Sequence, residues 1–147
     1  MPLQFRNVHA QPDDDVDTWP YEALVTAIER GLVPDWQPVF ARIRSAPWGR
    51  VARRVERHLQ TREHDGVGEL FRSAIERARA DADRAERAEV ASRVRDAVER
   101  SGMTKAKFAE SIGTSPPRLS TYLSGSVTPS AAMLVRIERA APRGGVV

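Results

Sequence analysis

The chain has 147 residues, of which 41% are hydrophobic and 29% are charged, and these fractions are ordinary for a folded globular protein. Cysteine is absent, which excludes disulfides and thiolate metal sites. The three histidines, His9, His58 and His64, have no partner at zinc-ligand spacing. We therefore expect one domain or two small ones, with no metal and no cofactor.

No stretch of the sequence approaches the ~18 apolar residues that a membrane span needs, and no apolar run follows the first basic residue, as a signal peptide would require. We therefore expect a cytoplasmic protein with no membrane attachment. The net charge is +3, and residues 101–147 hold six of the 23 basic residues but only two of the 20 acidic ones. Such a surplus favours contact with a polyanion, although basic tails are common.

Helical periodicity dominates the chain, and no segment alternates apolar and β-branched residues as a strand would, so the expected fold class is all-α. The first helix is predicted to follow a cap at Thr18 and to end at Gly31, and the second to follow a cap at Asp35. A third helix follows Pro47. Its buried face is predicted to comprise Trp48, Val51, Ala52, Val55 and Leu59.

Residues 67–100 are rich in Ala, Arg and Glu and carry two apolar stripes, one that includes Leu70 and Phe71 and one that includes Val90 and Val94. Between them, residues 79–89 alternate in charge and have only alanine as an apolar residue. This pattern predicts a solvated helical connector or a hinge between two helices. We place a domain boundary near Asp83, with an N-terminal all-α unit at residues 1–82 and a second domain at residues 83–147.

Residues 103–125 read MTKAKFAESIGTSPPRLSTYLSG, a pattern typical of two short helices that meet across a tight turn. Thr104 is predicted to cap the first helix and Ser115 the second, with Pro116 at the first helical position. Gly113 would supply the positive φ of the turn. The predicted inward residues are Phe108, Ala109, Ile112, Leu119, Tyr122 and Leu123, and those left outside are Arg118, Ser120, Thr121 and Ser124.

This segment resembles the Cro/CI-type (XRE) family of helix-turn-helix domains. The residues that carry the resemblance are Met103, Thr104, Lys105, Phe108, Ala109, Glu110, Ile112, Gly113, Ser115, Leu119, Ser120, Leu123, Gly125, Pro129, Ser130 and Leu134. The resemblance implies a domain of four or five helices, like that of lambda repressor, which acts as a dimer on a near-palindromic operator. It would make Ser115 to Ser124 the recognition helix, which lies in the major groove.

The resemblance also implies roles for individual residues. Base edges would be faced by Pro116, Pro117, Arg118 and Thr121, and phosphates by Thr104, Lys105 and Ser124, while Ser115 and Ser120 complete the expected DNA-binding set. Arg118 could pair with a guanine, and the methyl group of Thr121 could touch a thymine methyl group. The two prolines depart from the family pattern, in which Gln, Ser or Asn is frequent, so indirect readout would contribute to specificity.

Residues 1–82 show no family resemblance and no catalytic constellation, so we expect no enzyme activity. Trp19, Trp36 and Trp48 are expected to be core residues, with an interface role as the alternative. Basic residues recur along the third predicted helix, at Arg50, Arg53, Arg54 and Arg57. A solvated face is the favoured interpretation, ahead of a second DNA contact or an acidic partner.

The expected function is therefore a transcription regulator that binds double-stranded DNA, most simply a homodimeric repressor whose residues 1–82 supply dimerisation. The alternative function is an antitoxin, in which residues 1–82 bind a protein partner and the helix-turn-helix represses the operon; this alternative rests on family analogy. A structural alternative is that residues 85–141 form only a compact helical bundle, with Gly113 and Gly125 as ordinary C-caps.

Overall fold

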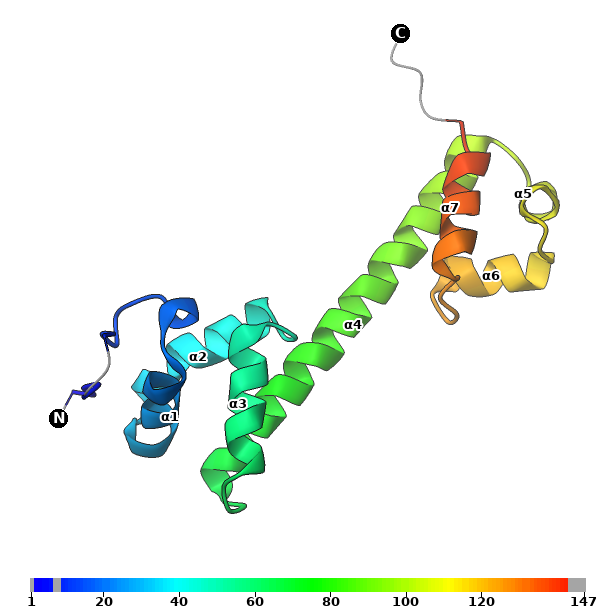
Figure 1. The fold of residues 1–147 in the computed structure, drawn as a ribbon. Coiled ribbons are helices and arrows are strands. Elements are labelled where there is room, and N and C mark those ends of the chain that lie inside the picture. Colours follow the sequence, from blue (N-terminus) through cyan, green and yellow to red (C-terminus); the bar gives the residue numbers. More distant parts are fainter. Residues whose placement is uncertain (1, 7–8, 143–147) are drawn as a thin grey trace, which may run out of the picture. The chain divides into compact units, whose positions relative to one another are not determined.

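The computed structural model describes residues 2–6 and 9–142, and over these residues the protein contains α-helices and one short 3₁₀ helix, with no β-strand (Figure 1). The predicted all-α class is confirmed. The chain divides into two compact units, Met1–Ala82 and Asp83–Val147. The boundary between them falls within the long helix α4 (Gly66–Ser101).

The N-terminal unit contains the 3₁₀ helix η1 (Val16–Thr18), α1 (Tyr21–Arg30), α2 (Val33–Ser45), α3 (Arg50–Gln60) and the first part of α4. Its core joins residues from every one of these elements, among them Trp19, Leu24, Ile28, Val39, Ile43, Val55 and Phe71. The Trp36 ring packs edge-on against Phe71, with ring centroids 5.6 Å apart, and its Nε1 donates a hydrogen bond to the carbonyl of Ala27 at 2.8 Å. Two of the three tryptophans, Trp19 and Trp36, are therefore core residues, as predicted.

The predicted start of the first helix is wrong. Thr18 ends η1, and α1 begins only at Tyr21. The cause is Pro20, which disfavours the helical conformation in the residue before it, and Trp19 is accordingly extended, with φ −65° and ψ 132°. Thr18 and α1 are thus separated by two residues that cannot continue a helix.

The role predicted for Asp35 at the start of the second helix also needs correction. α2 begins at Val33, so Asp35 lies inside its first turn. From there its carboxylate accepts a hydrogen bond from the backbone amide of Leu32 at 2.7 Å. Asp35 therefore satisfies an amide group at the helix start, but from within the helix.

The predicted buried face of α3 is confirmed except at Trp48. Val51, Ala52, Val55 and Leu59 are buried, whereas Trp48 is 50% exposed. Trp48 lies in the turn that precedes α3, and the extended residue Gly49 separates it from the helix, so its side chain does not continue the helical face.

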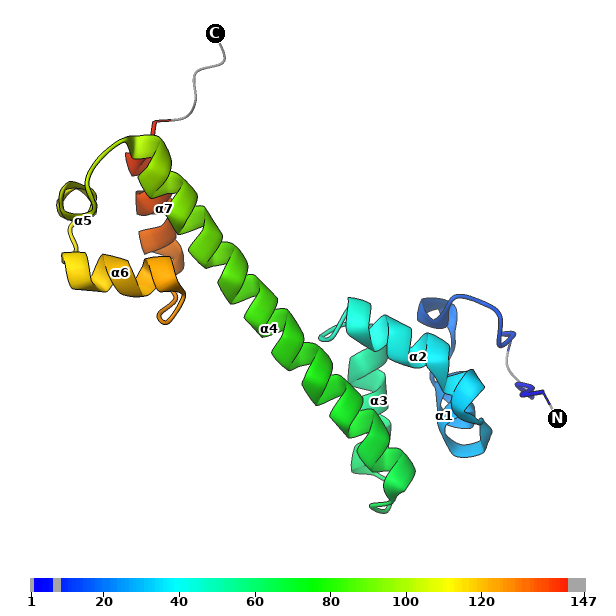
Figure 2. The ribbon, with the colours of Figure 1, turned by 180° about the vertical axis from the view of Figure 1, so that it is seen from behind.

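α4 is one continuous helix of 36 residues, so the predicted connector is present and the alternative of a hinge is not (Figures 1 and 2). Every side chain from Asp83 to Glu89 is exposed. Asp83 forms an ion pair with Arg87 one turn later, at 2.9 Å, in the order along the helix that favours helix formation. On the predicted N-terminal stripe of α4, Phe71 is fully buried, but Leu70 is 45% exposed.

The C-terminal unit contains the rest of α4, α5 (Lys105–Ile112), α6 (Pro116–Ser124) and α7 (Ala131–Ala140). The three short helices and α4 share one core of Val94, Ala97, Phe108, Ala109, Ile112, Leu119, Tyr122, Ile137 and Ala141. This core is separate from that of the N-terminal unit. None of the described helices is both long and apolar enough to cross a membrane.

Candidate nucleic-acid interface

The first helix of the predicted motif is formed as the sequence indicated. The Thr104 hydroxyl caps α5 by accepting a hydrogen bond from the backbone amide of Lys107 at 3.2 Å. The helix ends at Gly113, which has φ 74° and ψ 35°. After it, the amide of Thr114 donates to the carbonyl of Ala109 at 2.9 Å. The turn therefore uses a left-handed residue where only glycine avoids a steric cost.

The second helix of the motif is also confirmed. The Ser115 hydroxyl accepts a hydrogen bond from the backbone amide of Arg118 at 3.3 Å, and Pro116 is the first residue of α6. Leu119 and Tyr122 are buried, and Leu123 is half-buried. Because Ala109 of α5 is fully buried and has only a methyl side chain, it leaves room for α6 to pack closely on α5.

Two arginines that the sequence analysis did not single out hold the ends of these helices. From α7, the Arg136 guanidinium donates to the carbonyl of Ile112 at the end of α5, at 3.2 Å. From α4, Arg95 donates to the carbonyl of Leu123 near the end of α6, at 2.9 Å. Both place a cation at the negative end of a helix dipole. Their partners lie 24 and 28 residues away along the chain, so no local pattern could have identified them.

Eight of the nine predicted DNA-binding residues are exposed, namely Thr104, Lys105, Ser115, Pro116, Pro117, Arg118, Ser120 and Ser124. Thr121, which was predicted to lie outside, is half-buried. The reason is that the chain after α6 folds back over it, and the Val127 amide donates to the Thr121 carbonyl at 3.2 Å. Its own hydroxyl donates to the carbonyl of Arg118 at 2.6 Å.

The Arg118 side chain lies along α6. Its Nε donates to the hydroxyl of Tyr122 at 3.2 Å, and its guanidinium carbon is 6.0 Å from the centroid of the Tyr122 ring. Within the described part of the chain, its two terminal nitrogens have no hydrogen-bond partner. Tyr122 therefore orients the guanidinium group and leaves its outer edge available to a ligand.

The charge around the motif is strongly biased. Residues 101–137 contain five basic residues and only one acidic residue, Glu110. Neither α5 nor α6 has an acidic residue in its first turn, so the positive end of each helix dipole is not neutralised by a carboxylate on the same helix. This combination is attractive to phosphate groups.

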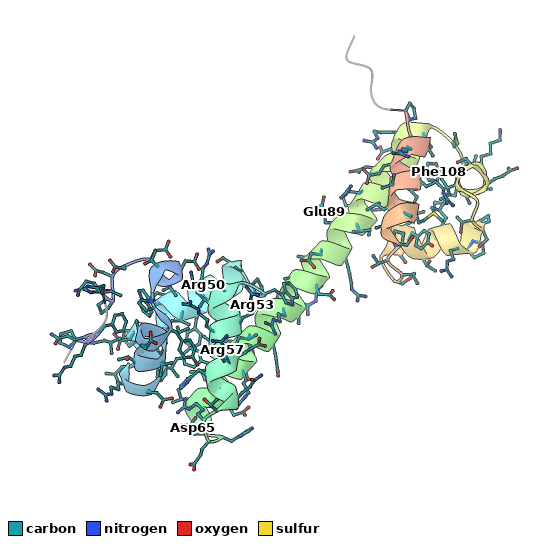
Figure 3. The ribbon with its side chains drawn as sticks, in the orientation of Figure 1. Arg50, Arg53, Arg57, Asp65, Glu89 and Phe108 are labelled. Carbon is teal, nitrogen blue, oxygen red and sulfur yellow. The ribbon has the colours of Figure 1, made fainter. Side chains whose placement is uncertain are left out.

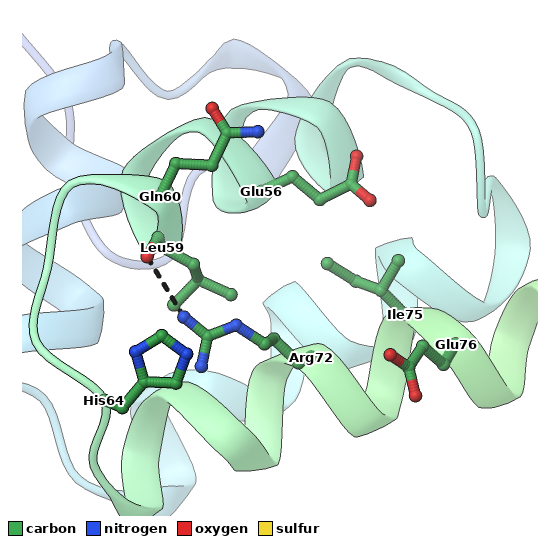
Figure 4. A pocket seen from close by; sticks show the side chains of 7 residues that line it. All are labelled: Glu56, Leu59, Gln60, His64, Arg72, Ile75 and Glu76. Carbon is green, nitrogen blue, oxygen red and sulfur yellow. Dashed lines mark hydrogen bonds between the residues drawn. The ribbon is translucent and has the colours of Figure 1, made fainter.

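The N-terminal unit has a shallow pocket of about 450 Å³ between α3 and α4 (Figure 4). Its lining residues are Glu56, Leu59, Gln60, His64, Arg72, Ile75 and Glu76. Arg79 neutralises Glu56 with a two-pronged ion pair, and Arg72 donates to Glu69 at 3.0 Å and to the Leu59 carbonyl at 3.1 Å. Because these charges already have protein partners, we assign no ligand to the pocket.

Comparison with known families agrees with the geometry of the C-terminal unit. A family model described as "Helix-turn-helix" matches residues 94–142. The matched segment contains the end of α4 and all of α5, α6 and α7. The comparisons with curated proteins and with solved structures gave no match. Residues 94–142 thus form a helix-turn-helix domain, which supports a DNA-binding transcription regulator.

Proposed function

We propose that the protein is a dimeric repressor of the Cro/CI type that binds a near-palindromic operator and places α6 in the major groove. The observation that carries the proposal is the capped α5–Gly113–α6 turn inside the matched helix-turn-helix segment. This arrangement exposes the outer face of α6 and fixes α6 at both ends. A preformed helix can enter the groove without the cost of ordering it on binding.

In this proposal the exposed residues have two roles. Thr104, Lys105 and Ser124 contact phosphates and fix the register of the domain, while Arg118 reads a guanine through its free terminal nitrogens. Ser115, Pro116, Pro117, Ser120 and Thr121 line the base edges. The half-buried Thr121 offers less surface than the sequence suggested, and the prolines offer no hydrogen-bond donor, so DNA shape contributes much of the specificity.

The proposed dimer forms through the N-terminal unit. Four large apolar side chains are exposed there, Leu32, Val33, Trp48 and Leu70, and exposed apolar surface commonly marks an interface. A two-fold dimer would bind half-sites roughly 34 Å apart, about one turn of the duplex.

The direct test is selection from a library of random duplexes by the full chain at two salt concentrations, followed by sequencing of the retained DNA. The proposal predicts an enriched inverted repeat. Retention that falls with salt but enriches no sequence would contradict it, because a basic surface alone binds any duplex.

The alternative function, an antitoxin, is favoured by the same exposed apolar residues of the N-terminal unit, because they equally suit a protein partner. It predicts that the protein isolated from its native source carries a second protein at a fixed ratio. A homodimer that binds the selected duplex with full affinity and carries no other protein would contradict the antitoxin function.

A further inference from the structure

One face of α3 in the N-terminal unit is entirely basic apart from a terminal glutamine. Arg50, Arg53 and Arg57 are exposed and are spaced by three and four residues, so they share the side of the helix opposite its buried face (Figure 3). We call these three residues the arginine face. Arg54, at its edge, donates to the carbonyl of Trp19 at 3.0 Å, and Arg57 lies over the Tyr21 ring at 5.7 Å from its centroid.

The charges of the arginine face are not neutralised within the described residues. Nearby carboxylates have other partners: Glu56 pairs with Arg79, and Glu29 pairs with His58 and Arg62. No ion pair or side-chain hydrogen bond joins Arg50, Arg53 or Arg57 to any described residue. The guanidinium groups are therefore available to an anionic partner.

The arrangement is also unfavourable for the helix itself. Arg50 and Arg53 lie in the first turn of α3, which has no acidic residue, and so add positive charge at the positive end of the helix dipole. Arg53 and Arg57 are like charges four residues apart and repel each other. A polyanion would relieve both effects, whereas a merely solvated helix would gain from a glutamate at these positions.

Nor does the arginine face follow from a generally basic unit. Residues 1–82 contain 12 basic and 13 acidic residues, so the N-terminal unit is close to neutral. Its acidic run at Asp13–Asp15 lies beside α2, since Asp14 and Asp15 border a surface hollow with Pro38 and Ala41. The positive charge is thus concentrated on one helix face.

We infer that the arginine face is a second DNA-contacting surface, which binds the phosphate backbone without reading sequence; this inference rests on the proposed DNA-binding function. Seven residues of α-helix separate Arg50 from Arg57, which is about 10.5 Å along the helix axis. Successive phosphates of one strand advance about 3.4 Å along the duplex axis, so the face has the length of about three of them. A duplex bound by the helix-turn-helix domain is a polyanion already tethered to the same chain, which raises its effective concentration at the arginine face.

The test compares full-length variants on a random-sequence duplex and on the duplex enriched by selection, over a series of salt concentrations. The variant R50Q/R53Q/R57Q removes the face, and the matched control R30Q/R44Q/R77Q removes three other exposed arginines of the same unit. Each phosphate contact contributes about 0.9 to the slope of log affinity against log salt concentration. The face variant is expected to lose up to about three contacts per chain from that slope on both duplexes and to keep its preference for the enriched one, while the control keeps the wild-type slope.

A second variant, R50K/R53K/R57K, keeps the charge and is expected to keep the slope, because counterion release depends on charge. Thermal melting of each variant checks folding, and the face variant should melt no lower than the wild type, since it loses only repulsion. Equal slopes for the face variant and the wild type would overturn the inference, as would equal losses in the face variant and the control. Equal slopes together with a loss of binding to polyglutamate would assign the face to an acidic protein instead.

The two proposals fail in different ways. If no sequence is enriched in the selection, operator reading by α6 fails, but the slopes on the random duplex still decide the role of the arginine face. If a sequence is enriched and the slopes are equal, only the inference about the arginine face fails.

Discussion

Gly113 is the residue on whose backbone conformation the proposed interface depends most directly. Its φ of 74° is unfavourable for any residue with a Cβ atom, although a Cβ placed there would meet only Arg136 Nη1, at 3.9 Å. Replacement by alanine should therefore destabilise the C-terminal unit through the backbone alone, by about 1–2 kcal/mol. Denaturant unfolding followed by circular dichroism measures this loss.

Gly66→Ala is the matched control for Gly113→Ala. Gly66 is the first residue of α4, its φ is not positive, and a Cβ there would meet no atom within 4 Å. Alanine at this position should leave stability unchanged or raise it by about 0.4–1 kcal/mol, because it restricts the unfolded chain. Equal losses in the two variants would show that the left-handed conformation of Gly113 carries no special cost.

The tryptophans give a second prediction. Trp36 is 9% exposed, packs against Phe71 and donates a hydrogen bond to Ala27, so Trp36→Ala should cost about 3–5 kcal/mol. Trp48→Ala should cost less than about 1 kcal/mol, because half of that side chain is already in water. Unfolding free energies of the two variants decide; a large loss in Trp48→Ala would mean that Trp48 is buried in solution, for instance in a dimer interface.

At this scale the sequence predicted residues whose roles are local. Thr104, Gly113 and Ser115 act on backbone groups within a few positions, so their residue types were sufficient to predict the caps. Trp48 was placed wrongly because its burial depends on where the turn before α3 ends, which is set by Gly49 and the path of the chain. Thr121 was misjudged because Val127 covers it from beyond the helix.

At the scale of the element, α5 and α6 are expected to divide the work of binding. Arg118→Ala should weaken binding to the enriched duplex by ~1–3 kcal/mol and relax the preference at one base pair of each half-site. Lys105→Ala should weaken binding to all duplexes alike and reduce the salt slope by about 0.9 per chain. Equilibrium titrations of the enriched duplex and of single-base variants measure both effects.

Arg139→Ala is the control for these two variants. Arg139 is an exposed basic residue of α7 in the same unit but outside α5 and α6. It should leave both affinity and base preference close to those of the wild type. Unchanged binding in Arg118→Ala and Lys105→Ala together would remove the assignment of α6 as the recognition helix.

The elements themselves were largely predictable, and their mutual fixation was not. The apolar spacing and the caps predicted α5 and α6, and the helix-turn-helix match covers both. The contacts of Arg95 and Arg136 with the ends of these helices join segments far apart in the sequence. Such contacts depend on packing geometry, which a periodic pattern does not contain. The same holds for the contact of Arg118 with Tyr122, whose geometry is set by rotamers.

At the scale of the whole molecule, we predict that residues 83–147 fold without the N-terminal unit. They form a compact unit with a core of their own, and the residues of α4 between Asp83 and Glu89 are exposed. The isolated fragment should be helical and melt cooperatively, and it should prefer the same sequence as the full chain with lower affinity, because it lacks the proposed dimer contacts. Circular dichroism and duplex titration test this, and an unfolded fragment would contradict the proposed domain boundary near Asp83.

The class of the fold followed from periodicity, but the sequence left the middle of α4 open between a connector and a hinge. Alternating charges and alanines suit either structure, and α4 continues because its local pairs, such as Asp83 with Arg87, favour helix and no proline or glycine interrupts residues 79–89. The functions of the N-terminal unit were not predictable in the same way, because exposed apolar side chains and an arginine face name no partner by themselves.

The most direct test of the central claim is the ratio of two dissociation constants, for the enriched duplex and for a duplex of the same composition in shuffled order, measured at one salt concentration. Reading of bases by α6 predicts a ratio of at least about 10³ in favour of the enriched duplex. Equal dissociation constants would contradict the claim, because binding would then rest on phosphate contacts alone.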